Sequence, residues 1–88
     1  MEILKSASAG TLESSDAYVE ISPADSLLVE IESVVKGQFG EEIERATREV
    51  LAECKIDKAN VRVVDRGALE CVIRARVEAA AVRAKEAK

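Results

Sequence analysis

The chain has 88 residues, of which 48% are hydrophobic and 34% charged, and its net charge is −4. This length allows one small domain with a modest core, and the apolar content is too high for a disordered chain. The sequence contains no histidine, which excludes Ser-His and Cys-His catalysis and most zinc sites and favours a carrier, binding or subunit role over a standalone enzyme.

The first third of the chain predicts a loop followed by two strands. Residues 1–16 are small and polar and lack a helical period, so we expect an extended or flexible segment near the surface that adds little to the core. Residues 17–22 alternate between apolar and polar, which predicts a half-buried strand. Residues 27–35 alternate again after a turn at Pro23. We therefore expect a second strand, antiparallel to the first.

The middle of the chain predicts a helix and a third strand. Gly37 and Gly40 interrupt the pattern, and from Glu41 onward apolar residues recur every three or four positions, which is typical of one helical face. Residues 61–64 then predict a short strand. A strand–helix–strand crossover places this strand parallel to the preceding one.

The last segment predicts a second helix. Its apolar stripe begins at Leu69 and ends at Ala84, and its alanines favour helix. Residues 68–75 also alternate, so a hairpin through Gly67 is the alternative. The predicted fold class is α+β: a single domain over residues 1–88, of order β-β-α-β-α, with a short mixed sheet packed against two helices in two layers.

The remaining features limit location and partners. Cys54 and Cys71 lie among apolar neighbours, which predicts buried reduced thiols rather than a disulfide or a metal pair. No apolar run could span a membrane and no signal peptide is visible, so we expect a cytoplasmic protein without a membrane partner. Residues 1–44 contain ten acids and two bases, which argues against nucleic-acid binding there. Tyr18 and Phe39 are expected in the core.

Two serines compete as attachment sites. Ser26 lies in the triplet Asp-Ser-Leu, which also surrounds the phosphopantetheinylated serine of ordinary acyl carrier proteins. In those proteins the serine opens a long helix, whereas residues 27–32 here have the period of a strand. The other candidate lies in residues 9–16, AGTLESSD, a small and accessible segment in which residue type alone leaves both Ser14 and Ser15 open.

Residues 9–16, together with DRGALECVIRARVEA at residues 65–79, resemble the acyl carrier (gamma) subunit of citrate lyase, and the resemblance covers nearly the whole chain. It implies that Ser14 covalently carries 2'-(5''-phosphoribosyl)-3'-dephospho-CoA, attached by a dedicated transferase. It further implies that this arm presents acetyl and citryl thioesters to the alpha (transferase) and beta (lyase) subunits during cleavage of citrate to oxaloacetate and acetate. The carrier itself then has no catalytic residue and no metal.

Several alternatives stay open. The carrier of citramalate lyase or of malonate decarboxylase uses a similar arm, and a structural or adaptor domain without a prosthetic group is a rival of another class. Glu13 and Asp16 flank Ser14, and they either are solvated loop acids or repel the phosphates of an arm and direct it outward. Arg74 and Arg76 either grip phosphates or lie on a solvated helix face.

Overall fold

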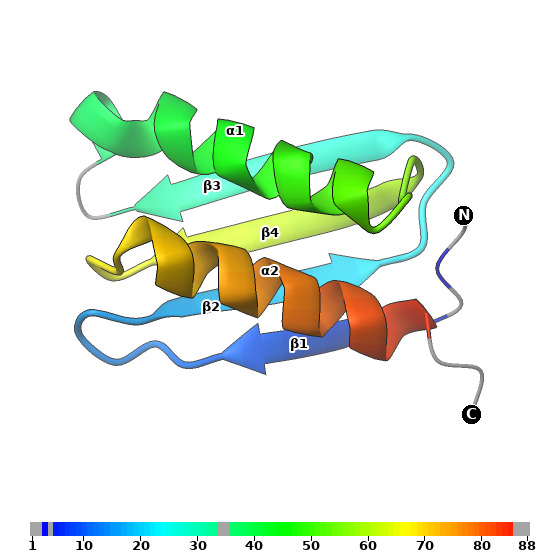
Figure 1. The fold of residues 1–88 in the computed structure, drawn as a ribbon, viewed down its shortest axis with the longest axis horizontal. Helices are drawn as coiled ribbons and strands as arrows, with labels where there is room; N and C mark the ends of the chain where they lie inside the picture. Colours follow the sequence, from blue (N-terminus) through cyan, green and yellow to red (C-terminus); the bar gives the residue numbers. More distant parts are fainter. Residues whose placement is uncertain (1–2, 4, 34–35, 86–88) are drawn as a thin grey trace.

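The structure, a computed structural model, describes residues 3, 5–33 and 36–85, and for residues 36–39 only the main chain. Four strands and two helices follow in chain order: β1 (Ala7–Gly10), β2 (Ala17–Ser22), β3 (Leu27–Ser33), α1 (Lys36–Glu53), β4 (Ala59–Asp65) and α2 (Glu70–Lys85). Both helices lie on one face of a single sheet and leave its other face open (Figure 1). The predicted α+β class is therefore confirmed, and the five predicted elements occur in the predicted order.

The strands are ordered β1-β2-β4-β3 in the sheet. As predicted, β3 and β4 are parallel and are joined through α1. The predicted antiparallel pairing of β2 with β3 is wrong, because β4 lies between them and pairs antiparallel with β2. Burial explains this order: Val61 and Val63 in β4 are fully buried, whereas β3 alternates between half-buried and exposed positions, as an edge strand does.

The sequence did not predict β1, which forms the other edge of the sheet and pairs antiparallel with β2 from Ala7 to Gly10. Ile3 and Ala9 are also buried, although we expected this segment to contribute little to the core. Large side chains are not needed in β1, because α2 packs against this strand with small residues of its own. The buried residues of α2 include Ala80, Ala81 and Ala84.

Both predicted helices are present, with corrected details. Helix α1 begins at Lys36 rather than Glu41 and includes Gly37 and Gly40. Residues 70–85 form α2, so the alternative hairpin is wrong. The Asp65 carboxylate lies just before α2, where its Oδ1 accepts hydrogen bonds from the main-chain N–H groups of Gly67 (3.1 Å) and Ala68 (2.8 Å). These bonds fix the turn that leads into the helix.

Some predicted core residues lie elsewhere. Cys54 is half-buried and Cys71 is exposed, so the prediction of two buried thiols is wrong for Cys71. Tyr18 is half-buried, and its hydroxyl donates to Glu20 Oε2 at 3.1 Å. Tyr18 precedes the fully buried Val19 in β2 and so faces the open side of the sheet. The side chain of Phe39 lies outside the described part of the structure.

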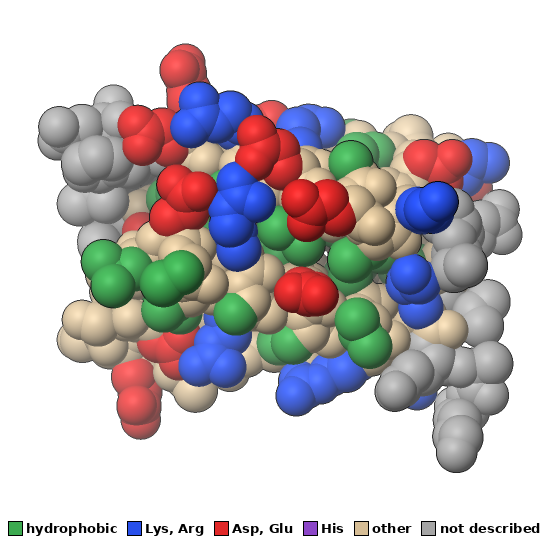
Figure 2. All heavy atoms as spheres, viewed as in Figure 1, with side chains coloured by type: hydrophobic (Ala, Val, Ile, Leu, Met, Phe, Trp, Pro, Cys, Tyr) green, Lys and Arg blue, Asp and Glu red, His purple; other side chains and the backbone are tan. Residues whose placement is uncertain are grey.

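The helical face is covered by interspersed acidic and basic side chains (Figure 2). Arg74 pairs with Glu49 on α1 and with Glu70 one turn earlier on α2. Arg74 is thus part of a mixed-charge helix surface, as one of the two predicted alternatives had it. Among the residues that the structure describes, no helix is long and apolar enough to cross a membrane.

Candidate functional site

Residues 11–16 form the turn that connects β1 to β2, and Ser14 lies at its tip. Asp16 N–H donates to the Glu13 carbonyl at 3.1 Å, which makes Ser14 and Ser15 the two central residues of a β-turn. The Ser14 side chain is exposed. We call residues 11–16 the attachment turn.

Ser15 and Asp16 together face one residue of the neighbouring strand end, Arg66. Ser15 N–H donates to the Arg66 carbonyl at 2.8 Å, and Arg66 N–H donates to the Asp16 carbonyl at 2.9 Å. Ser15 has φ 68°, in the left-handed region that glycine usually occupies. In a G1 bulge, two residues of one strand lie opposite a single residue of the neighbouring strand, and the first of the two adopts the left-handed conformation. Ser15 and Asp16 have this arrangement opposite Arg66. The bulge fixes the main chain of Ser15 against Arg66 and leaves Ser14 projecting beyond the sheet.

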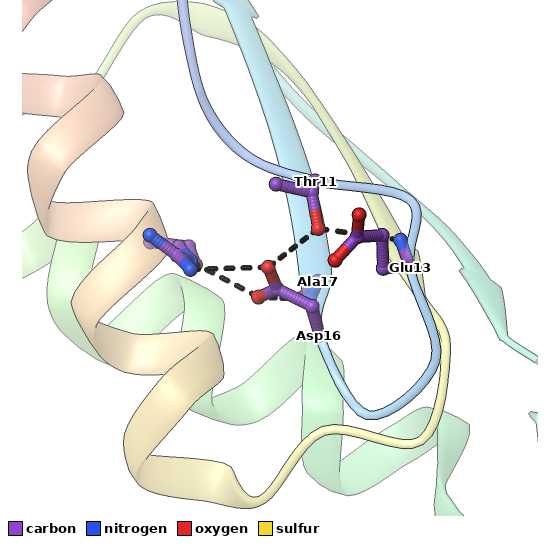
Figure 3. Close-up of polar contacts among 5 residues, drawn as sticks. Thr11, Glu13, Asp16 and Ala17 are labelled. Atoms are coloured by element: carbon purple, nitrogen blue, oxygen red, sulfur yellow. Dashed lines mark hydrogen bonds and ion pairs between the residues drawn. The ribbon is translucent and has the colours of Figure 1, made fainter.

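The carboxylate of Asp16 holds the turn together from the side of the helices (Figure 3). Its Oδ2 accepts from Thr11 Oγ1 at 2.7 Å and from Arg76 Nη2 at 3.0 Å. Its Oδ1 accepts from Arg76 Nε at 3.1 Å and from the Ala17 N–H at 2.7 Å. Thr11 Oγ1 in turn accepts from the Glu13 N–H at 3.2 Å. One carboxylate thus connects both ends of the attachment turn to α2.

These hydrogen bonds also keep Asp16 ionised. The bond from Thr11, the bidentate contact with Arg76 and the Ala17 N–H together lower the pKa of Asp16 from 3.8 to about 2. The Asp16 side chain is only 16% exposed, whereas that of Arg76 is 39% exposed. The ion pair is therefore partly shielded and forms the main link between the turn and α2.

This pairing changes two predictions made from the sequence. Asp16 fits neither alternative given for it, solvated acid or repulsion of an arm's phosphates, because its charge is balanced by Arg76. The exposed carboxylate of Glu13 alone flanks Ser14 without an ion pair among the described residues. Arg76 neither lies free on a solvated face nor is available to grip phosphates. The sequence signal was present, because Asp16 and Arg76 lie in the two distant blocks, but spacing alone could not pair them.

Gly10 lets β1 enter the attachment turn. Its φ is +93°, and a Cβ atom at this position would lie 1.9 Å from the Ala17 carbonyl oxygen and 3.1 Å from Arg76 Cδ. A main-chain contact of 1.9 Å cannot be relieved by rotating a side chain, so only glycine is compatible with this geometry. The close approach of residues 10 and 17 brings the ends of β1 and β2 together below the turn.

The rival serine, Ser26, lies in the connection between β2 and β3, at the opposite end of β2 (Figure 1). It is exposed, and its carbonyl accepts from the Ala59 N–H at 3.1 Å. The residues after Ser26 form β3 and not a helix. The structural context of the serine in ordinary acyl carrier proteins is therefore absent at Ser26.

An exposed hydroxyl on a turn with a fixed main chain suits the covalent attachment of a large group. The Ser14 oxygen is accessible to a modifying enzyme, and a group attached there leaves the buried residues in place. Among the residues that the structure describes, no group of three or more His, Cys, Asp or Glu side chains could hold a metal ion.

The chain is similar to known proteins over nearly its whole length. The family described as malonate decarboxylase delta subunit matches residues 4–84. The citrate lyase acyl carrier protein of Escherichia fergusonii is 57% identical over 88 residues, covering 98% of this chain and 91% of that protein. The protein of the same name from Haemophilus influenzae strain PittGG is 58% identical over 86 residues, covering 98% of this chain and 90% of that protein.

A solved structure shares the fold. A crystal structure of a protein from Thermus thermophilus matches with a TM-score of 0.57 and 14% sequence identity, over 94% of this chain and 16% of that protein. At this identity the match concerns the arrangement of helices and strands alone.

Proposed function

The chain belongs to the family of the malonate decarboxylase delta subunit and is related along nearly its whole length to citrate lyase acyl carrier proteins, and from this we propose that it is the acyl carrier subunit of a citrate lyase complex. The carrier has no catalytic activity of its own and serves partner subunits. The observation that carries the proposal is the exposed Ser14 at the tip of a turn that is held on one side by main-chain hydrogen bonds to Arg66 and on the other by the ion pair with Arg76.

We propose that Ser14 is esterified to the phosphoribosyl-dephospho-CoA arm, and that a dedicated transferase attaches it. When bound, the arm supplies a terminal thiol that holds acetyl and citryl groups as thioesters for the alpha and beta subunits of the lyase. The chain's own contribution is mechanical. The contacts of Asp16 with Thr11 and Arg76 hold the base of the arm in one place, so that a long flexible group swings from a fixed point.

Ser15 is the less suitable attachment residue. Its side chain is exposed, but its main chain is bonded to Arg66 and lies in the left-handed region, so Ser15 is tied to the strand end. Ser14 occupies the preceding turn position without a positive φ. The geometry therefore favours the serine that the resemblance also indicates.

The carrier of a malonate decarboxylase is the second candidate, because the family match bears that description. Both candidates use the same attachment turn and differ in the partner subunits. Assembly with purified subunits of each enzyme would separate them.

The function is tested by reconstituting citrate cleavage from the purified subunits and the loaded carrier. We expect Ser14→Ala to abolish cleavage, because no arm can be attached. Ser15→Ala is the matched control and should retain most of the activity. A Ser14→Ala carrier that supports cleavage as well as the wild type would contradict the proposal and favour an unmodified adaptor domain.

A further inference from the structure

Arg66 lies directly opposite the attachment turn. Its carbonyl accepts from the Ser15 N–H at 2.8 Å, and its N–H donates to the Asp16 carbonyl at 2.9 Å. These two main-chain bonds fix Arg66 beside the residues that immediately follow Ser14. Ser14 is the residue directly before this pairing, so the main chain of Arg66 lies one residue away from the turn tip, and a long arginine side chain can extend over that distance.

The guanidinium of Arg66 is exposed and has no ion pair or hydrogen bond with any residue that the structure describes. Two acids next to Arg66, one across the bulge and one in the chain, are already engaged. Asp16 is held by Arg76 and Thr11. The buried carboxylate of Asp65 accepts from Ser33 Oγ at 2.7 Å and from two N–H groups of the following turn. The described residues thus give the Arg66 guanidinium no ion pair, and the main chain of Arg66 lies opposite the residue that follows Ser14.

We propose that the Arg66 guanidinium binds the phosphate through which the arm is esterified to Ser14; this inference rests on the proposed function. A phosphodiester has a single negative charge shared by two free oxygens, and the planar guanidinium matches such a pair of oxygens. Arg66 also offsets the exposed carboxylate of Glu13, which otherwise repels the phosphate. The phosphate supplies the counter-ion that the described residues do not.

Arg66 therefore differs in role from the other arginine near the turn. Arg76 binds Asp16 and shapes the turn before any group is attached. Arg66 acts only after the arm has been attached, when it binds the phosphate that joins the arm to Ser14. Loss of Arg66 should then leave the fold intact and change the environment of the phosphate.

The test compares loaded wild type with loaded Arg66→Gln by ³¹P NMR. The phosphodiester resonance should move in Arg66→Gln toward its position in the denatured loaded protein, while the pyrophosphate resonances of the same arm stay in place. Release of the arm by an added phosphodiesterase should be up to about fivefold faster, as expected for loss of an exposed ion pair. Arg66→Lys, which keeps the charge, should restore much of the wild-type release rate.

Arg45→Gln provides the control for lost charge. Arg45 is exposed on α1, has no ion pair with a described residue, and α1 packs toward the opposite edge of the sheet at β3. Its substitution should change neither the resonance nor the release rate. Unchanged values in Arg66→Gln would overturn the inference while leaving the proposed function intact. A wild-type protein without any arm on Ser14 would instead overturn the proposed function itself.

Discussion

The two serine-bearing connections at opposite ends of β2 are built differently. The attachment turn contains Ser14 and is fixed by a bulge opposite Arg66 and by the bidentate ion pair of Asp16 with Arg76. The connection from Ser22 to Leu27 contains Ser26, and the one main-chain bond seen there between described elements is Ala59 N–H to the Ser26 carbonyl.

This difference bears on the choice between the two serines as the proposed attachment site. Both serines are exposed, so accessibility does not separate them. What separates them is the set of contacts that holds the surrounding main chain, and under the proposed function these contacts position the base of a long arm. The attachment turn gains these contacts from residues far away in the sequence, and the following predictions test that dependence.

The largest effect is expected at Gly10. Gly10→Ala combines a positive φ with a Cβ atom 1.9 Å from the Ala17 carbonyl oxygen. The left-handed conformation alone costs about 1–2 kcal/mol, and the clash should bring the loss in the free energy of unfolding to roughly 3 kcal/mol or more. Urea unfolding at pH 7 measures it.

Gly67 provides the matched control for this substitution. It has a similar φ of +94°, but a Cβ atom there would meet nothing within 4 Å. Gly67→Ala should therefore cost only about 1–2 kcal/mol, which is the cost of the left-handed conformation. Equal losses for the two variants would mean that the close approach of residues 10 and 17 does not constrain the attachment turn.

A smaller, pH-dependent effect is expected at Asp16. Its pKa is lowered from 3.8 to about 2, so the folded protein favours the ionised carboxylate. This contribution to stability is fully present above pH 3.8 and is lost as the pH falls toward and through 2. Asp16→Asn should be less stable than the wild type at pH 7, and the difference should shrink on acidification. Urea midpoints between about pH 2 and 6 measure this trend.

Asp25→Asn is the corresponding control in the other connection. Asp25 is exposed and lies beside Ser26. In Asp25→Asn, the urea midpoint should depend on pH in the same way as in the wild type. If Asp16→Asn follows the wild-type curve at every pH, the carboxylate does not hold the turn as described.

The sequence predicted those elements whose own residues carry a clear period. Residues 17–22 alternate between apolar and polar, and β2 has these bounds. The apolar stripe that ends at Ala84 lies in α2. The first strand was missed because Ala7–Gly10 has no bulky residue, and its burial depends on the small residues of α2 that cover it. The strand order was wrong because it depends on which strand has a neighbouring strand at each of its two edges, as β4 does, and no local pattern determines that.

The sequence predicted that the segment around Ser14 is accessible, but it did not predict the contacts that hold this segment in place. Ser14 was chosen through the resemblance, and its place on an exposed turn agrees with the accessible segment expected from small residues. The link between Asp16 and Arg76 joins residues 60 positions apart, and the bulge opposite Arg66 depends on the β2–β4 register. Contacts of this kind arise from tertiary structure, and the spacing of residue types cannot reveal them.

The most direct test of the central claim is peptide mass spectrometry of the protein from its native host, with fragmentation to separate Ser14 from Ser15. The account predicts that Ser14 gains a mass equal to the phosphoribosyl-dephospho-CoA arm while the Ser26 peptide stays unmodified. Phosphopantetheine on Ser26, or no modification of either serine in cells that are consuming citrate, would contradict it.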